Sequence, residues 1–294
     1  MQGPFRSFLF TPGNHARKVA KVFDAGADAV ILDLEDAVAI AEKPATRATV
    51  VEALKRPRSC LGYVRVNAYD TEFCFRDVVS VVGPWLDGIV LPKVESAEQL
   101  QSIDWLLGNL EAERGLAQGS IDLMPIIETG KAMADLGAIA SSSTRVRRLS
   151  FGAGDYTLDM NMVWSLGESE LHHARATVAM CSRAAGLEPP LDTVFIHIGA
   201  RFQDALVEAS KIPKTLGFQG KLCIHPEQVM PVNNVFTPGE DEVEHARKVV
   251  AAFDEAEANG SASIQVDGYF VDYPIVEKAR RSLAIIEGIN ARTS

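Results

Sequence analysis

The feature that most constrains the fold of this chain is a regular alternation of short apolar runs with longer segments of helical periodicity. Eight of these runs are rich in Val, Ile, Leu and Phe, and most lack strict polar alternation. Such runs are typical of parallel strands that are covered on both faces. The predicted strands are Ser7–Phe10, Ala29–Leu34, Tyr63–Asn67, Gly88–Leu91, Leu123–Ile127, Arg148–Phe151, Thr193–Ile198 and Lys221–Ile224.

The segments between these runs have the apolar spacing of helices that bury one face. Examples of the predicted helices are Asn14–Ala25, Lys43–Leu54, Ala97–Leu107, Ala132–Ala140, Glu168–Ala185 and Arg201–Leu216. Strand and helix therefore alternate eight times in about 225 residues, which favours a closed barrel over a doubly wound sheet. No GxGxxG motif follows the first strand, and this weakens the dinucleotide-binding alternative. We predict an α/β fold, a (β/α)8 TIM barrel over residues 1–231.

The remaining residues, 232–294, exceed what the barrel needs. They contain an amphipathic helix that should end at Asn259–Gly260, because Gly commonly follows the last helical turn. A strand-like piece at Ser263–Val266, a turn at Asp267–Gly268 and a last helix from Pro274 follow. We predict a C-terminal helical extension with too little material for a large core of its own, and we expect it to form an oligomer contact.

Composition excludes several classes of protein. The net charge of -10 and the lack of a Lys/Arg run argue against nucleic acid or anionic lipid as a partner. The longest apolar runs are too short for a signal peptide or a membrane span. The four cysteines are scattered without a CxxC pair, which indicates neither a zinc site nor a disulfide framework. We expect a cytoplasmic protein with no membrane and no nucleic-acid partner.

Polar side chains gather where the predicted strands end. In a barrel of this kind the functional site lies at the carboxyl ends of the strands. The groups expected there are Thr11-Pro12-Gly13, Asp33, Glu35, Asp36, Arg65, Asn67, Lys93, Glu128, Asp155, His197, His225 and Pro226.

Glu128 and Asp155 are the candidate metal ligands. They follow two successive predicted strands, and neighbouring strands lie roughly 5 Å apart, so the two carboxylates can converge on one cation. Two carboxylates with open positions suit Mg²⁺, which keeps several waters, whereas the lack of a Cys or His set disfavours zinc. The alternative is that Glu128 caps the next helix and Asp155 satisfies a Gly-rich turn.

Arg65 lies inside the apolar strand VRVN, where an unpaired guanidinium is costly to bury. It must therefore meet an anion, either a structural partner such as Asp33 or Glu35, or a substrate carboxylate or enolate. Strand alternation sends Asp33 and Glu35 to one side and Asp36 to the other. At least one of these three carboxylates should pair with Arg or Lys.

The two histidines at strand ends, His197 and His225, could each be a base or a ligand. A histidine in this position is more often hydrogen-bonded within the core, and we favour that interpretation for both. Gly152 and Gly154 form no complete phosphate motif and indicate instead a close approach of the backbone to the site.

Taken together, these segments resemble the citrate lyase β-subunit-like branch of the HpcH/HpaI aldolase and citrate lyase superfamily. Eight collinear motifs across nearly the whole chain carry the resemblance. They are RSFLFTPG at Arg6, GADAVILDLEDAV at Gly26, VRVN at Val64, GIVLPKVESAEQL at Gly88, IIETGKA at Ile126, LSFGAGDYTLDM at Leu149, GFQGKLCIHPEQV at Gly217 and FTPGEDEVEHARKV at Phe236.

The resemblance implies a (β/α)8 barrel in trimers or hexamers, with Mg²⁺ on Glu128 and Asp155 and with Arg65 steadying a thioester oxygen. Its activity would be the cleavage or formation of a carbon–carbon bond in a β-hydroxyacyl thioester, usually of coenzyme A. The candidate catalytic residues are Arg65, Asp36 and Asp272. Further candidate substrate contacts, beside Arg65 and Glu128, are Thr11, Pro12, Gly13, Lys93 and Pro226.

Asp272 matches a motif that supplies a catalytic acid or base to a neighbouring subunit in the family. The alternative is an N-terminal cap of the helix that begins near Pro274. The chain departs from the family pattern at FIHIGARFQD, where an acidic pair is common, and at Lys131. These departures suggest an unusual acyl group.

Two other functions remain open at this point. A hydroxyacyl-CoA thioesterase would use a similar site but leave the hydroxy acid whole. A non-catalytic binding or regulatory homologue would keep the barrel and the cation without turnover, because a fold does not establish activity.

Overall fold

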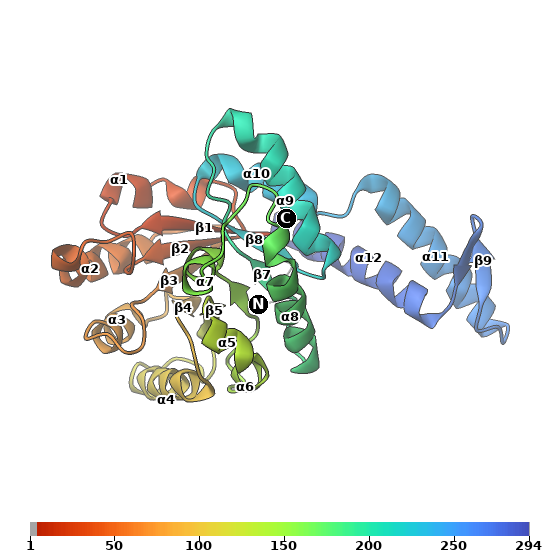
Figure 1. Cartoon of the computed structure of the whole chain (residues 1–294). Coiled ribbons are helices and arrows are strands. Elements are labelled where there is room, and N and C mark those ends of the chain that lie inside the picture. The colour runs from red at the N-terminus through yellow and green to blue at the C-terminus, as the bar shows by residue number, and fades with distance from the viewer. Residues whose placement is uncertain (1–4, 294) are drawn as a thin grey trace. The chain divides into compact units, whose positions relative to one another are not determined.

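The structure is a computed structural model that describes residues 5–293. Eight parallel strands form a closed barrel in the order of the chain, with β1 pairing β8 to complete it (Figure 1). The predicted (β/α)8 TIM barrel is therefore confirmed. The strands are β1 (Ser7–Pro12), β2 (Ala29–Asp33), β3 (Leu61–Arg65), β4 (Gly88–Leu91), β5 (Asp122–Ile127), β6 (Ser150–Phe151), β7 (Leu191–Asp192) and β8 (Gly220–Cys223).

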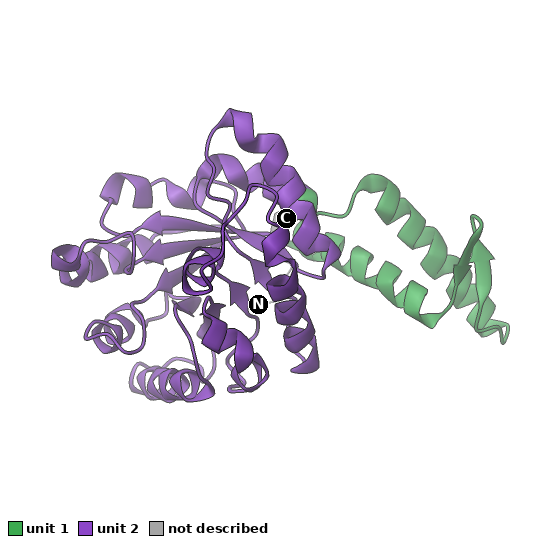
Figure 2. Ribbon diagram, viewed as in Figure 1, with its two compact units in different colours: residues 1–4, 235–294 green, residues 5–234 purple. Residues whose placement is uncertain are grey.

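Helices surround the barrel, and the chain divides into two compact units, residues 5–234 and residues 235–293 (Figure 2). The helix predicted at Lys43–Leu54 has those bounds in the structure. The α-helices of residues 5–234 are α1 (Ala16–Val19), α2 (Lys43–Leu54), α3 (Cys74–Val81), α4 (Ala97–Glu113), α5 (Gly130–Ala134), α6 (Leu136–Ala140), α7 (Ala153–Asp159), α8 (His172–Ala184) and α9 (Gln203–Thr215), and α10 (Val229–Phe236) runs across the division.

The strands are continuous apolar runs because both of their faces are covered. Every residue of β2, β4 and β5 is buried. Inside the barrel, side chains from several strands form one apolar cluster that includes Phe8, Ile31, Val90, Met124 and Ile126. Filling the interior in this way leaves the ends of the strands as the place for polar groups.

The seventh strand differs from the prediction. Only Leu191 and Asp192 join the sheet, and residues 193–198 follow as irregular chain. Side chains satisfy backbone groups of this segment and its neighbours: Gln228 donates to the Phe195 carbonyl (2.8 Å), and Thr193 Oγ1 accepts from the Ala153 N–H (2.8 Å). The apolar run predicted a strand because it is partly buried, although its backbone has no ladder partner.

A buried ionic cluster reinforces the barrel at this narrow point. The Asp192 carboxylate on β7 accepts from Arg175 Nε (2.7 Å) of α8 and from Lys221 Nζ (2.5 Å) of β8. Arg175 also donates to Glu168 (2.5 Å). Burial raises the pKa of Asp192, but the two cations lower it further, so that the pKa lies below its ordinary value. The cluster ties α8, β7 and β8 together where the strand ladder is short.

Residues 235–293 form α11 (Glu240–Ala258), a hairpin of β9 (Ile264–Val266) and β10 (Tyr269–Val271), and α12 (Tyr273–Thr293). The turn at Asp267–Gly268 has φ values of 50° and 85°, as a two-residue hairpin loop requires. The unit has a small core of its own, formed by Val249, Phe253, Val271 and Val276. The strand β10 was not predicted. No helix of the described residues is long and apolar enough to cross a membrane.

We expect Asp192→Asn to lower the free energy of unfolding by roughly 3–5 kcal/mol, because it leaves the buried Lys221 facing a neutral amide and leaves Arg175 with Glu168 but without Asp192. Chemical denaturation measures the change. The control is Glu113→Gln, which removes an exposed carboxylate from α4 and should stay within about 0.5 kcal/mol of wild type. Equal stabilities of the two variants would show that the cluster contributes nothing to barrel closure.

Candidate active site

The carboxyl ends of β2 to β6 bring five carboxylates and two cations into one network. Adjacent members contact one another through hydrogen bonds or ion pairs, although they come from five different strand ends. Its members are Asp33, Glu35, Asp36, Arg65, Lys93, Glu128 and Asp155.

Arg65 makes a bidentate pair with Asp33, with Nε and Nη2 each 2.7 Å from a carboxylate oxygen. Its Nη1 lies 3.1 Å from Glu35 Oε2, and the guanidinium stacks 4.9 Å from the centre of the Phe10 ring. Burial lowers the pKa of Arg65, but the carboxylates, Asp33 above all, raise it above its ordinary value. Two guanidinium nitrogens, Nε and Nη2, thus bind Asp33, and the third, Nη1, faces the other charged groups.

Glu35 and Asp36 lie on the same side of the site, which corrects the predicted alternation. Lys93 Nζ donates to Glu35 Oε1 (2.6 Å) and to Asp36 Oδ1 (3.3 Å). Because β2 ends at Asp33, the next residues form a turn and no longer alternate as a strand does. Burial raises the pKa of Glu35 above its ordinary value, although Arg65 and Lys93 oppose the shift.

Glu128 is a buried carboxylate, 5% exposed, at the end of β5. Its Oε1 accepts from the Lys93 N–H (2.7 Å), and Lys93 adopts φ 52°. A Cβ on Gly152 would lie 2.5 Å from Glu128 Oε2, so only glycine fits beside this carboxylate. Burial and the nearby Asp155 raise the pKa of Glu128 to about 8.

Asp155 lies in the first turn of α7, which directly follows β6 and Gly152. Its Oδ2 is 3.8 Å from Lys93 Nζ. The pair formed by Glu128 and Asp155 could hold a divalent cation, because five carboxylates face only two cations here and burial and Asp155 raise the pKa of Glu128. Among residues 5–293 no group of three or more His, Cys, Asp or Glu converges as a metal site. Such a cation would keep open positions for water or substrate, as Mg²⁺ prefers.

Thr11, Pro12 and Gly13 border the network from β1. Pro12 pairs with Asp33 in the barrel register, and the Gly13 N–H donates to the Asp33 carbonyl (2.9 Å). Pro226 opens a 3-10 turn after β8, in which His225 Nδ1 accepts from the Glu227 N–H (3.3 Å).

His197 packs against the rings of Phe195 and Phe202, with centroids 5.4 and 4.8 Å away. His225 caps the turn that follows β8. Both histidines have structural contacts, but neither matches the predicted hydrogen bond within the core: His197 packs against aromatic rings, and His225 caps an exposed turn.

Asp272 belongs to the other compact unit, residues 235–293, and the structure does not place it in the network. It directly precedes α12, where its Oδ1 accepts from the Ile275 N–H (3.4 Å) and its carbonyl accepts from Ile275 and Val276. These contacts are those of an N-terminal cap.

Sequence reasoning missed Lys43, which is 7% exposed and binds the turn after β2. A signal was present, because Lys43 begins a helix beside Pro44 and has Arg47 one turn later on the same face. It was not recognised because a lysine at a helix start normally lies in solvent.

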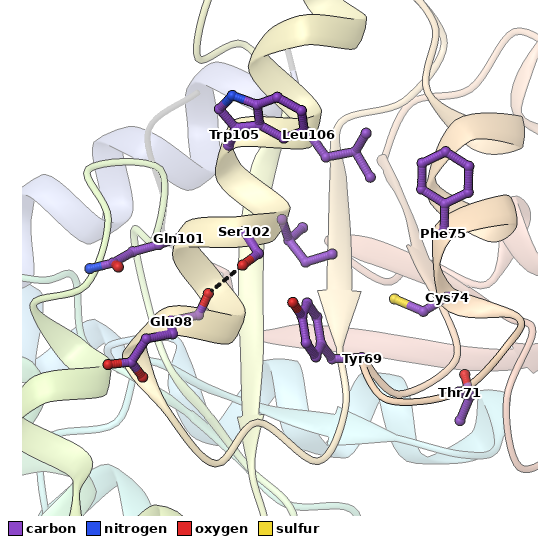
Figure 3. Close-up of a pocket in the computed structure, with 10 residues that line it drawn as sticks. Tyr69, Thr71, Cys74, Phe75, Glu98, Gln101, Ser102, Trp105 and Leu106 are labelled. Atoms are coloured by element: carbon purple, nitrogen blue, oxygen red, sulfur yellow. Dashed lines mark hydrogen bonds between the residues drawn. The ribbon is translucent and has the colours of Figure 1, made fainter.

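A groove of about 710 Å³ lies between α3 and α4, outside the barrel (Figure 3). Tyr69, Phe75 and Trp105 line it, and Glu98 is the only charged side chain among its lining residues. It contains no member of the charged network. We therefore place the candidate active site at the carboxyl ends of the strands and not in this groove.

Comparison with models of protein families assigns the chain to one family. The model of the HpcH/HpaI aldolase/citrate lyase family matches residues 6–226, which include the whole charged network. The chain belongs to the HpcH/HpaI aldolase/citrate lyase family. It is a lyase of this family, as the resemblance of its motifs had indicated.

Individual relatives agree with the assignment. The chain is 36% identical to citrate lyase subunit beta of Leuconostoc mesenteroides subsp. cremoris, over 95% of this chain and 92% of that protein. It is 33% identical to L-malyl-CoA/beta-methylmalyl-CoA lyase of Cereibacter sphaeroides, over 98% and 96%. The structure of CitE from Mycobacterium tuberculosis with magnesium, acetoacetate and coenzyme A matches with a TM-score of 0.78 and 27% identity, over 97% of this chain and 99% of that one.

The raised pKa of Glu128 predicts how stability depends on pH without a divalent cation. Between the ordinary value of 4.5 and about 8, the native protein holds a proton that the unfolded chain has released. Stability should therefore fall as pH rises through this interval, by at most about 1.4 kcal/mol per pH unit from this group. Thermal unfolding in chelator, compared with Glu128→Gln, isolates the effect, and identical pH profiles of the two proteins would contradict it.

Proposed function

We propose that this chain is a Mg²⁺-dependent carbon–carbon lyase that acts on a β-hydroxyacyl thioester of the coenzyme A type. It would cleave the thioester to an oxo acid and a shorter acyl thioester, or form it from them. The observation that carries the proposal is the buried Glu128 carboxylate beside Asp155, with Arg65 and Lys93 in the same network. The Mycobacterium tuberculosis structure, which holds magnesium and coenzyme A, supports it.

In the cleavage direction, the hydroxyl proton leaves to a base and a carbonyl forms on the same carbon. The bond to the α-carbon breaks, and its electron pair passes into a thioester enolate, which takes a proton to give the acyl thioester. Mg²⁺ held by Glu128 and Asp155 would supply Lewis acidity and a template for substrate oxygens. Arg65 Nη1 would donate to the enolate oxygen as its charge develops.

The remaining charged groups have separate roles in this scheme. Burial lowers the pKa of Lys93, but Glu35 and Asp36 raise it above its ordinary value, so Lys93 stays an ammonium and does not act as a Schiff-base amine. It would hold Glu35 and contact substrate. Asp36 is half-exposed beside Lys93 and is the candidate base within the barrel.

We propose further that the chain forms a trimer or hexamer in which Asp272 handles a proton in a neighbouring subunit's site. Exposed aromatic side chains near it, Tyr269, Phe270 and Tyr273, support a contact. Exposed apolar side chains also follow β6 and β7, at the carboxyl side of the barrel: Leu158, Met160, Val163, Leu166, Ile196 and Ile198. A partner surface would bury both sets.

The metal assignment predicts that Glu128→Gln and Asp155→Asn each weaken Mg²⁺ binding by more than about tenfold and abolish activity, since each removes a charged ligand without changing shape. Calorimetry measures the affinity, and oxo-acid release from malyl, citramalyl and citryl thioesters measures the activity. Glu98→Gln, in the groove outside the barrel, is the control. Unchanged Mg²⁺ affinity in both site variants would remove the metal from this site, and release of an intact hydroxy acid would indicate a thioesterase.

Arg65→Lys should lower kcat on the order of 100-fold although it keeps the charge, because an ammonium cannot both pair bidentately with Asp33 and donate to the enolate oxygen. Steady-state kinetics on the cleaved thioester measure the effect. Turnover near that of wild type would assign Arg65 a structural role alone.

The shared-site proposal predicts complementation. Inactive Asp272→Ala subunits mixed with inactive Glu128→Ala subunits should regain activity, because about one quarter of sites in randomly mixed rings would contain both native residues. Mass spectrometry confirms the mixing. Mixed rings that stay inactive, together with an Asp272→Ala variant that is only less stable, would leave Asp272 as the cap of α12.

A further inference from the structure

Lys43 is a buried lysine to which the proposed reaction gives no role. It is the first residue of α2, and its side chain is directed inward. The ammonium donates to the carbonyls of Leu34 (3.0 Å) and Glu35 (2.6 Å) and to Asn67 Oδ1 (2.6 Å). All three acceptors are neutral, so no direct ion pair offsets the burial of this charge.

Asn67 connects Lys43 to a second buried group. The Asn67 amide donates to Asp77 Oδ2 (2.6 Å) and to the Leu34 carbonyl (3.0 Å). Arg47 Nε donates to the other oxygen of Asp77 (2.7 Å). Lys43 and Arg47 are four residues apart, so the same face of α2 binds both ends of the Asn67–Asp77 pair. The orientation of Lys43 is therefore fixed.

The turn after β2 is held from two sides. The Asp33 carboxylate accepts from the N–H groups of Glu35 (2.9 Å) and Ala37 (3.1 Å). Lys43 binds the carbonyls of the same turn, those of Leu34 and Glu35. Asp33 thus binds backbone donors of this turn, and Lys43 binds backbone acceptors. Removal of either side chain would free part of the turn.

Packing alone does not explain an ammonium at this position. A Met side chain would fill the same space without the cost of burying a charge. The Glu35 carbonyl and the Asn67 amide oxygen, however, need donors, and Lys43 serves both, together with the Leu34 carbonyl that Asn67 also binds. The benefit of the charge is the conformation that it imposes on the turn.

We propose that Lys43 is a positioning residue: by binding the carbonyls of Leu34 and Glu35, it fixes the turn that holds the Glu35 carboxylate between Arg65 and Lys93. Its kinetic consequence rests on the proposed lyase function. Its structural consequence, a turn that opens when the ammonium is removed, does not.

The test uses Lys43→Met in the full-length protein. Hydrogen–deuterium exchange should become faster in the peptide that covers residues 33–42, while exchange in β5 and β8 stays as in wild type. The kcat on the thioester that wild type cleaves should fall on the order of 100-fold, because a small displacement of Arg65 and Lys93 misplaces the reacting groups. KM should change less than kcat, since Glu128 and Asp155 do not contact the turn that Lys43 holds.

Leu54→Ala is the matched control. Leu54 is fully buried near the other end of α2, and its truncation lowers thermal stability without touching the turn. Exchange over residues 33–42 and kcat per folded enzyme should then equal those of wild type. A second variant, Asn67→Ala, removes an acceptor of Lys43, and the double variant should lose little more kcat than Lys43→Met alone if the two act as one unit.

The outcomes separate the two proposals. If Lys43→Met matches Leu54→Ala, with lower stability but normal exchange over residues 33–42 and normal kcat, the positioning role is wrong. If exchange increases in Lys43→Met but wild type cleaves none of the thioesters, the turn-holding role stands and the proposed function fails.

Discussion

The carboxylate of Asp33 is the contact on which the arrangement at the barrel mouth depends. Its two oxygens accept from Arg65 Nε and Nη2 and from the N–H groups of Glu35 and Ala37. Burial opposes its ionisation, yet these donors keep its pKa below the ordinary value. Asp33 thereby joins β2, β3 and the following turn, and it leaves Arg65 Nη1 as the nitrogen that faces the other carboxylates. A neutral residue here would release Arg65 and the turn together.

The cluster around Asp192 and the charged network at the carboxyl ends of the strands differ in their balance of charges. Around Asp192, the two cations Arg175 and Lys221 face two buried carboxylates, Asp192 and Glu168, and they lower the pKa of Asp192. At the carboxyl ends of the strands the balance of charges is reversed, and burial together with the nearby Asp155 raises the pKa of Glu128 to about 8. The first arrangement is electrostatically complete without any added ion. The second leaves carboxylates in excess over cations, which suits the cation site that we propose there.

Sequence periodicity predicted the barrel because apolar runs report burial, and burial on both faces is what parallel strands share. It could not predict that residues 193–198 leave the sheet, since burial does not reveal which backbone groups find ladder partners. The predicted strand ends bring Arg65, Glu128 and Asp155 to one end of the barrel, and the structure has them there, because the topology of the barrel gathers those ends. The side on which Asp36 lies was wrong, since alternation stops where β2 ends. Lys43 was missed because a lysine at the start of a helix normally lies in solvent, so its burial against Leu34, Glu35 and Asn67 was not recognised.

The short seventh strand has a consequence for how such an enzyme can change over evolutionary time. Residues 193–198 contribute nothing to the strand ladder, and side chains such as Gln228 anchor them from neighbouring loops. Substitutions or small insertions there leave the closure of the barrel to Leu191, Asp192 and the ions around them. New side chains at the exposed Ile196 and Ile198 can therefore accumulate without loss of the fold, whereas Thr193 and Phe195 are buried and a side chain at Gly152 would collide with Glu128. At the carboxyl end of the barrel, the exposed positions after β7 are thus open to selection for new substrates, whereas the position of Gly152 is not.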